Sequence, residues 1–246
     1  MMELRNITDI HTHILYGVDD GPKEMTESVK MALKAYRAGV RTIVATPHMT
    51  PGEYDVSTAE IIEKAAILEE AVNERLTAEG KEKLTIYTGQ EAYYCDDLPE
   101  MLLQKKALTI AGGRYALVEF DPAAPYESIF SAARHLTDAG FVPVIAHMER
   151  YRNLYDGEKI SEMISVGALL SLNYASLTGS FLDPSVRMAR KLVKDGAAAL
   201  LASDMHGLSW RPPMYEEAFR WMEKHLEKEQ IYSLACGFPK AVTENR

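Results

Sequence analysis

Short apolar runs alternate with longer amphipathic stretches along the whole chain. The first run, "RNITDIH" at 5–11, predicts a buried strand, and the stretch at 23–39 has the apolar spacing of a helix that ends at Gly39. Further strands are predicted at 40–48, 83–94, 115–120, 141–147, 168–173 and 197–204. Helices are predicted between them at 57–80, 97–106, 125–140, 157–167 and 183–196, and after them at 213–226, 228–237 and 239–245.

This alternation defines the fold class. Strands separated by helices of this length imply right-handed crossovers and a parallel sheet. Seven such units form either a distorted barrel or an open, doubly wound sheet. No linker rich in glycine, proline or serine interrupts the pattern, so residues 1–246 are predicted to form a single domain. The N-cap of the helix at 57–80 is predicted to be Ser57 or Thr58.

Composition narrows the class of protein. Of the 246 residues 47% are hydrophobic, but no run approaches the roughly 18 consecutive apolar residues that a membrane span needs. The first ten residues lack the features of a secretory signal, which favours a cytoplasmic protein without membrane insertion. The formal net charge of -9 argues against a nucleic-acid partner. Cys95 and Cys236 are far apart and suggest neither a disulfide framework nor a zinc knuckle.

Histidines and carboxylates are concentrated where the predicted strands end. In parallel α/β proteins ligands bind at the carboxyl ends of the strands. Five of the seven histidines lie there, and only His135 and His225 fall inside predicted helices. The residues at the strand ends are His11, His13, His48, Glu91, Glu119, His147, Asp204 and His206. A single such histidine is usually structural, but the whole set is typical of a metal centre that holds two or three divalent ions such as zinc, iron or manganese.

Two arginines follow these strand ends. Arg150 lies three residues after His147, and Arg211 lies five after His206. A guanidinium in a loop is often only solvated, but two at matching positions favour bidentate binding of phosphate oxygens. Two metal ions and two arginines would together suit the displacement of a phosphoryl group.

The order and spacing of several segments resemble the polymerase and histidinol phosphatase (PHP) superfamily. Those segments are "DIHTHILYGVDDG", "AGVRTIVATPHMTPGEY", "GQEAYY", "YALVEF", "PVIAHMERY" and "ASDMH", which together span 9–206. The whole chain looks like the bacterial branch of manganese-dependent protein-tyrosine phosphatases, the CpsB/YwqE-like regulators of capsule and exopolysaccharide synthesis.

The resemblance implies a distorted (β/α)7 TIM-like barrel, the PHP fold, and assigns the ligands. His11, His13, Glu91 and Asp204 would hold one metal. Glu91 would bridge to a second metal held by Glu119 and His147. A third metal would be bound by His48, His206 and one aspartate of "VDDG", for which Asp20 is preferred and Asp19 is the alternative. Arg150 and Arg211 match arginines thought to bind the phosphate, and Mn²⁺ is the expected metal, with Fe or Zn as alternatives.

The resemblance also implies an activity and a partner. A metal-bridging hydroxide would attack the phosphorus of phosphotyrosine, and the phenolate would leave. The substrate would be a phosphotyrosine protein, in particular a bacterial tyrosine kinase that controls capsule or exopolysaccharide synthesis, and some members of the branch form homo-oligomers. Two alternatives remain open. One is a small-molecule phosphomonoesterase such as a histidinol-phosphate phosphatase. The other is an amidohydrolase, although that class expects a bridging lysine where this chain has Glu119.

A non-enzymatic interaction protein with a vestigial site is a further alternative, and the filled ligand positions argue against it. Cysteine-based phosphatase chemistry is not expected either. Neither Cys95 nor Cys236 is followed closely by an arginine in a phosphate-binding loop.

Overall fold

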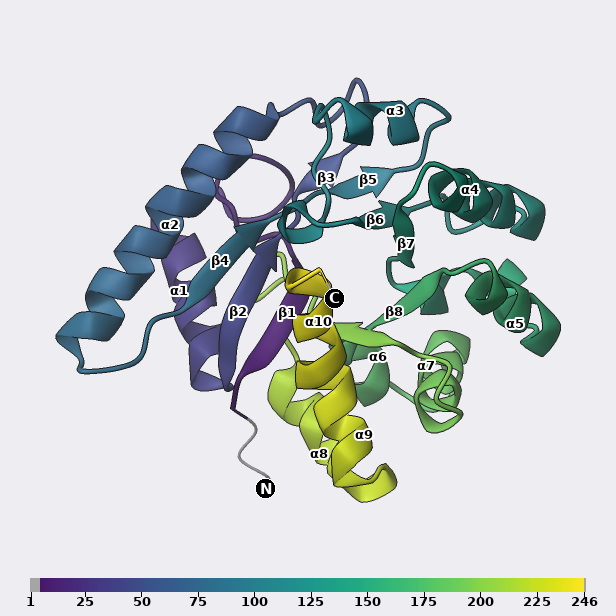
Figure 1. The fold of residues 1–246 in the computed structure, drawn as a ribbon. Coiled ribbons are helices and arrows are strands. Elements are labelled where there is room, and N and C mark those ends of the chain that lie inside the picture. Colours follow the sequence, from purple (N-terminus) through teal and green to yellow (C-terminus); the bar gives the residue numbers. More distant parts are fainter. Residues whose placement is uncertain (1–4, 246) are drawn as a thin grey trace.

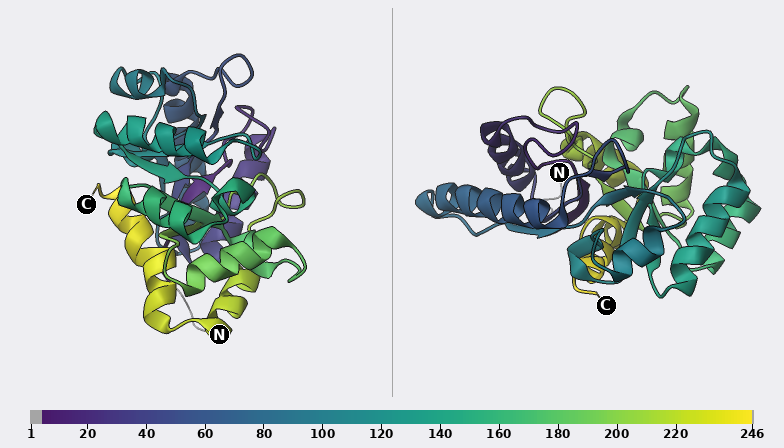
Figure 2. Two further views of the ribbon diagram at one scale, coloured as in Figure 1. Left: turned by 90° about the vertical axis from the view of Figure 1, so that its right-hand side faces the viewer. Right: turned by 90° about the horizontal axis from the view of Figure 1, so that it is seen from above.

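The computed structural model describes residues 5–245, and its strands form a parallel sheet that curls into an incomplete barrel with helices on its outer side (Figures 1 and 2). Hydrogen bonding connects the strands in the order β1-β2-β4 and β3-β5-β6-β7-β8-β9. The strands are β1 (Ile7–Thr12), β2 (Val40–Ala45), β3 (His48–Met49), β4 (Thr85–Thr88), β5 (Glu91–Tyr93), β6 (Tyr115–Glu119), β7 (Val142–Ile145), β8 (Leu169–Asn173) and β9 (Leu200–Ala202).

Two of the seven predicted strands are each divided in two. The strand predicted at 40–48 is interrupted at Thr46–Pro47, because proline has no N–H to donate to a ladder. The strand predicted at 83–94 is interrupted beside it at Gly89, where an added Cβ would lie 3.2 Å from the Thr46 side chain. Pairing resumes directly afterwards, with His48 in register with Glu91. The break therefore places two predicted ligands side by side.

The helices follow the predicted positions closely. They are α1 (Met25–Arg37), α2 (Thr58–Ala78), α3 (Leu98–Leu103), α4 (Tyr126–Asp138), α5 (Gly157–Ser165), α6 (Tyr174–Thr178), α7 (Pro184–Lys194), α8 (Tyr215–His225), α9 (Lys228–Tyr232) and α10 (Phe238–Thr243). Ser57 is the N-cap of α2, since its hydroxyl accepts the N–H of Glu60 at 3.2 Å. The sequence did not predict α6. It also predicted a break between α9 and α10, which are instead joined by one wide π turn at Ser233–Gly237.

A narrow seam joins the first strand to the last. The only bridge that joins β1 to the segment after β9 in the described part of the chain is Thr12–Met205. The Asp204 N–H donates to the His11 carbonyl at 2.9 Å, and the Ser203 N–H donates to the buried Asp9 carboxylate at 3.0 Å. A side chain thus replaces part of a strand ladder at the seam and fixes Asp204 beside the end of β1.

Buried apolar side chains form two groups, one inside the curled sheet and one outside it. The smaller group takes inward-facing residues from several strands, including Ile10, Val44, Leu117, Val144 and Leu200, together with Val242 of α10. This packing fills the interior and leaves the carboxyl ends of the strands for polar side chains. The larger group lies between the strands and the outer helices. Among residues 5–245, none of the helices is both long enough and apolar enough to cross a bilayer.

Candidate metal centre

All nine predicted metal ligands gather at the carboxyl ends of the strands. Eight of them form three overlapping groups in which the potential donor atoms lie within 4.8 Å of one another. The groups are His11, His13, Glu91 and Asp204; His48, Glu91 and Glu119; and His13, Asp20, His48 and His206. His147 lies against the second group. His135 and His225 lie in α4 and α8, as predicted.

The first group is completely buried. Glu91 Oε2 lies 3.2 Å from His11 Nε2 and 3.1 Å from His13 Nε2, and the two imidazole nitrogens lie 3.2 Å apart. Asp204 Oδ1 lies 3.5 Å from both nitrogens. Within residues 5–245 neither Glu91 Oε2 nor Asp204 Oδ1 has a hydrogen-bond partner. Buried oxygens without partners are costly, and a cation placed between these donors would satisfy them, so this donor set fits a divalent ion.

The second group shares Glu91 with the first. Glu91 Oε1 lies 2.7 Å from His147 Nε2, and Glu119 Oε2 lies 3.6 Å from the same nitrogen. The other oxygen of Glu119 lies 2.8 Å from His48 Nδ1. Glu91 therefore directs Oε1 at His147, while its Oε2 faces His11, His13 and, at 3.2 Å from Nδ1, His48. Its two oxygens face different donors, as those of a carboxylate shared by two ions would.

In the third group Asp20, rather than Asp19, faces the histidines. Asp20 Oδ1 lies 3.2 Å from His206 Nε2 and 3.6 Å from His48 Nε2. Asp19 instead contacts His13 Nδ1 at 2.7 Å and accepts the N–H of His48 at 3.1 Å. Asp19 therefore orients His13 in the manner of a carboxylate behind a ligand.

Gly21 is required for this arrangement. A Cβ on Gly21 would lie 2.4 Å from the carbonyl oxygen of His13, which is too close for any side chain. The glycine therefore allows the loop after β1 to fold back over His13 and to bring Asp19 and Asp20 to different sides of the centre.

Both predicted arginines converge on Asp204. Arg150 Nη2 donates to Asp204 Oδ2 at 2.7 Å, and Arg211 donates to the same oxygen and to His206 Nε2. Asn173, at the end of β8, also donates to Asp204 Oδ2 at 2.7 Å. Burial alone would raise the pKa of Asp204, but His11, Arg150 and His147 hold it well below its usual value. The Arg150 and Arg211 side chains keep 37% and 28% of their surface exposed, so both guanidinium groups can still meet a ligand from solvent.

The backbone is strained at several of these positions. His147, Asp204 and Arg211 have φ angles of 33°, 51° and 46°, in the left-handed region that residues with a side chain rarely adopt. Such conformations cost free energy and persist where the surroundings enforce them, commonly at functional sites.

Sequence reasoning missed the residues that support the centre. Asn173 ends β8 and could have been found by the rule that located the histidines, had amides been included. Tyr151 contacts His147 Nδ1 at 3.4 Å and accepts the N–H of Phe120, and no sequence signal marks it. Asp9 and Tyr215, which are 206 residues apart and bonded to each other, likewise leave no local pattern.

Burial and partners determine the protonation of two histidines. Burial alone lowers the pKa of His13, but Asp19 and Glu91 raise it to about 10. For His147, burial and Arg150 lower the pKa, while Glu91 and Glu119 raise it to about 9. Both imidazoles are therefore protonated at neutral pH before a metal binds.

We expect metal binding to release protons, because a protonated ring nitrogen cannot coordinate a cation. Below the raised pKa values, and so up to about pH 9, affinity should increase about tenfold per pH unit for each proton released. Calorimetric titration of Mn²⁺ into the metal-free protein in buffers of different ionisation enthalpy measures the number of protons. Release of no protons at pH 7 would show that these imidazoles are already neutral before the metal binds.

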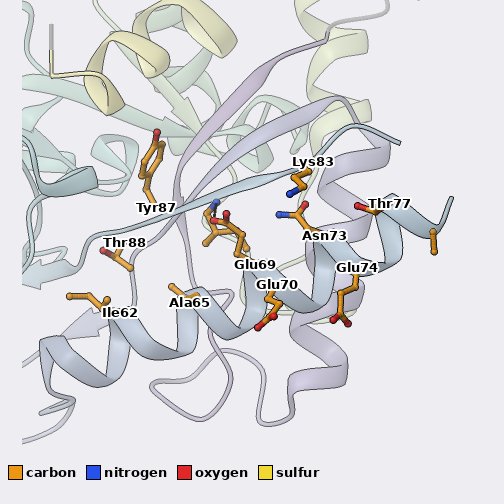
Figure 3. Close-up of a pocket in the computed structure, with 13 residues that line it drawn as sticks. Ile62, Ala65, Glu69, Glu70, Asn73, Glu74, Thr77, Lys83, Tyr87 and Thr88 are labelled. Atoms are coloured by element: carbon orange, nitrogen blue, oxygen red, sulfur yellow. Dashed lines mark hydrogen bonds between the residues drawn. The ribbon is translucent and has the colours of Figure 1, made fainter. Parts of the chain in front are cut away.

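A separate groove lies between α2 and β4 (Figure 3), and none of the nine predicted metal ligands lines it. Glu69 accepts the Ile86 N–H at 2.7 Å, and Asn73 exchanges two hydrogen bonds with Leu84. Its polar lining therefore joins the helix to the edge of the sheet. No histidine lines this groove, so it offers no second group of the kind found at the strand ends.

A curled parallel sheet with histidines and carboxylates in overlapping groups at its carboxyl end, flanked by arginines, defines the class of metal-dependent hydrolases. A family profile described as "Capsular polysaccharide synthesis, CpsB/CapC" matches residues 7–244, and the chain belongs to this family.

Named relatives support the assignment over nearly the full length. The chain is 32% identical over 243 residues to the tyrosine-protein phosphatase CpsB of Streptococcus agalactiae, which covers 96% of this chain and 98% of that protein. It is 32% identical to the tyrosine-protein phosphatase YwqE of Bacillus subtilis, with 92% and 87% covered.

Solved structures support the same family and fold. A structure reported for YwqE of Bacillus subtilis and CpsB of Streptococcus pneumoniae, described as unique metal-dependent tyrosine phosphatases, superposes with a TM-score of 0.86 and 30% identity, and covers 98% of this chain and 95% of that one. A phosphotriesterase from Mycobacterium tuberculosis matches with a TM-score of 0.62 and 13% identity over 99% and 95% of the two chains, which shows a shared TIM-barrel-like fold only.

Proposed function

We propose that this protein is a metal-dependent tyrosine phosphatase in which nine side chains hold two or three divalent ions. The observation that carries the proposal is Glu91, which directs one oxygen at the His11 and His13 nitrogens and the other at His147. The relatives that match 92% to 96% of the chain are named tyrosine-protein phosphatases.

The chain's own residues divide the work. His11, His13, Asp20, His48, Glu91, Glu119, His147, Asp204 and His206 would hold the ions. The ions supply Lewis acidity and lower the pKa of bound water. Arg150 and Arg211 would bind the non-bridging phosphate oxygens through their planar donors, exchanging part of their contact with Asp204 for the substrate.

The leaving group needs little help from an acid. In the hydrolysis an oxygen of water forms a bond to phosphorus, the bond from phosphorus to the phenolic oxygen breaks, and the proton of the water passes to solvent or to the phenolate. Because a phenol has a pKa near 10, its anion departs more readily than an alkoxide. This chemistry favours aryl over alkyl phosphates.

We also propose Mn²⁺ as the metal, with Fe or Zn as alternatives. Imidazole and carboxylate donors suit all three metals, no thiolate lies among the clustered donors of the described residues, and the resemblance to the manganese-dependent branch favours Mn²⁺. A phosphotyrosine-bearing kinase that acts in capsular polysaccharide synthesis fits the family description as the substrate protein. The cytoplasmic location, the single domain and the homo-oligomer stay predictions.

The test is hydrolysis of a phosphotyrosine peptide by chelator-treated protein with and without added Mn²⁺, alongside an alkyl phosphate and an amide or lactone substrate. We expect phosphotyrosine hydrolysis that requires the metal. Protein that metal analysis shows to be loaded but that leaves the peptide intact would overturn the proposal, and turnover of the alkyl phosphate, the amide or the lactone alone would establish one of the alternative activities.

Replacing Cys95 with serine should leave this activity unchanged within about twofold. Cys95 is partly buried and packs against the core. Burial raises the pKa of the other thiol, Cys236, to about 11, so it is not a nucleophilic thiolate. Steady-state kinetics of Cys95→Ser and Cys236→Ser measure the effect. An inactive Cys95→Ser protein that still binds its metals would contradict the metal mechanism.

A further inference from the structure

One large aromatic side chain stands exposed beside the metal centre. Trp210 keeps 57% of its surface exposed, although tryptophan usually buries most of its area. The Trp210 and His206 rings make an edge-to-face contact with their centroids 5.3 Å apart. The Arg211 guanidinium lies 5.6 Å from the centroid of the Trp210 ring. Trp210 therefore adjoins a proposed metal ligand and a proposed phosphate-binding residue at once.

The loop that carries Trp210 is held in a fixed shape. The His206 N–H donates to the Arg211 carbonyl at 3.1 Å and closes the loop. Gly207 approaches the Trp210 carbonyl so closely that a Cβ would lie 3.2 Å from it. The indole is therefore presented to solvent by an ordered turn, which lowers the entropic cost of binding a ligand against it.

A second aromatic side chain adjoins the same group of ligands from another loop. The Tyr54 ring stacks on His48, with centroids 5.4 Å apart and planes inclined by 23°. The Tyr54 N–H donates to the Thr50 carbonyl at 2.9 Å, so the turn after β3 fixes its position. The ring centroids of His48 and His206 lie 5.9 Å apart. Each histidine of this pair thus has its own aromatic neighbour.

The centre opens to solvent at Asp20 and His48, whereas the His206 side chain beside them is fully buried. The Asp20 side chain between the two histidines is 33% exposed and His48 is 14% exposed, whereas Glu91 and Asp204 are 1% exposed. A substrate enters where the ligands reach solvent. With its phosphoryl group turned toward the buried donors and the arginines, its leaving group would point outward, on the side where Tyr54 adjoins His48 and Trp210 adjoins His206.

We propose that Trp210 and Tyr54 bind the aromatic ring of the substrate and determine the preference for aryl over alkyl phosphates. This inference rests on the proposed function, which it deepens. Rings that stack or meet edge to face gain affinity beyond the area they bury, and such a contact is worth roughly threefold to tenfold in binding. An alkyl phosphate has no ring to place there and gains nothing from it.

The test compares a phosphotyrosine peptide with a phosphoserine peptide of the same sequence. We expect Trp210→Ala to lower kcat/KM for the phosphotyrosine peptide roughly threefold to tenfold, mainly through KM, and to leave the phosphoserine peptide unchanged. Tyr54→Ala should act in the same direction, and Trp210→Phe should restore most of the loss. Tyr232, equally exposed at 57% but far from the strand ends on α9, gives the control Tyr232→Ala. Equal losses on both peptides, or none, would overturn the proposal.

Fluorescence gives a readout that needs no turnover. The chain has two tryptophans, so Trp221→Phe leaves Trp210 as the single reporter. Phenylphosphonate should shift its emission at concentrations where calorimetry shows binding, and methylphosphonate should not. Unchanged emission with bound phenylphosphonate would refute the aromatic contact. If loaded wild-type protein fails to cleave phosphotyrosine, the proposed function is lost, whereas this titration still decides the role of Trp210.

Discussion

Replacing His13 with alanine should remove most of the bound metal and lower kcat/KM by more than about a hundredfold. Mutating a residue that hydrogen-bonds to a metal ligand already lowers metal affinity or activity ten- to a hundredfold. Removing the ligand itself should cost more. His13 belongs to two of the three donor groups, and it is held by Asp19 through Nδ1. Its loss would remove one donor from each of two groups. Metal analysis after dialysis and peptide kinetics measure both effects.

His225→Ala is the matched control. His225 is an exposed histidine at the end of α8, bonded to the Trp221 carbonyl. This change should keep both the metal content and the rate. A His13→Ala protein that retains its full metal content would show that the three groups of donors are not the metal site, even if its rate falls.

The second large effect is expected at Arg150. Arg150→Ala should keep its metal and lose about a hundredfold in kcat/KM, since the loss of one donor to a developing charge costs about 3 kcal/mol. Asp204 would still accept from Arg211 and Asn173, so its orientation should survive. Metal analysis, kinetics and phosphate inhibition separate the two roles.

Arg150→Lys distinguishes charge from shape. Lysine keeps the charge but not the planar pair of donors, so it should recover only part of the rate. Arg220→Ala is the control, because Arg220 is exposed on α8 and pairs with Glu217. Normal turnover by Arg150→Ala would contradict the proposed role of Arg150 in phosphate binding.

Much of the site could be located from sequence because one geometric rule applied. Side chains that end parallel strands meet at one edge, so His11, His48, Glu91 and His147 could be placed together without knowing how the strands pair. The choice between Asp19 and Asp20 could not be made this way. Both lie in a loop, where the contact of Gly21 with the His13 carbonyl decides the path.

The remaining features depend on contacts between distant segments. The strand breaks at Pro47 and Gly89 occur opposite each other, and only the pairing of the two strands makes them coincide. The bond between Asp9 and Tyr215 links residues near the two ends of the chain. No local pattern carries such information, whereas periodicity alone was enough to predict most helices.

The narrow seam gives the metal centre a second consequence. His11 and His13 belong to the first strand, and Asp204 follows the last, so an ion held by all three would cross-link the two ends of the sheet exactly where backbone pairing is thinnest. The chemistry and the closure of the barrel would then depend on the same atoms. Removing the metal would therefore lower the stability of the folded protein as well as its activity. When the ion is scarce, the protein would unfold more readily.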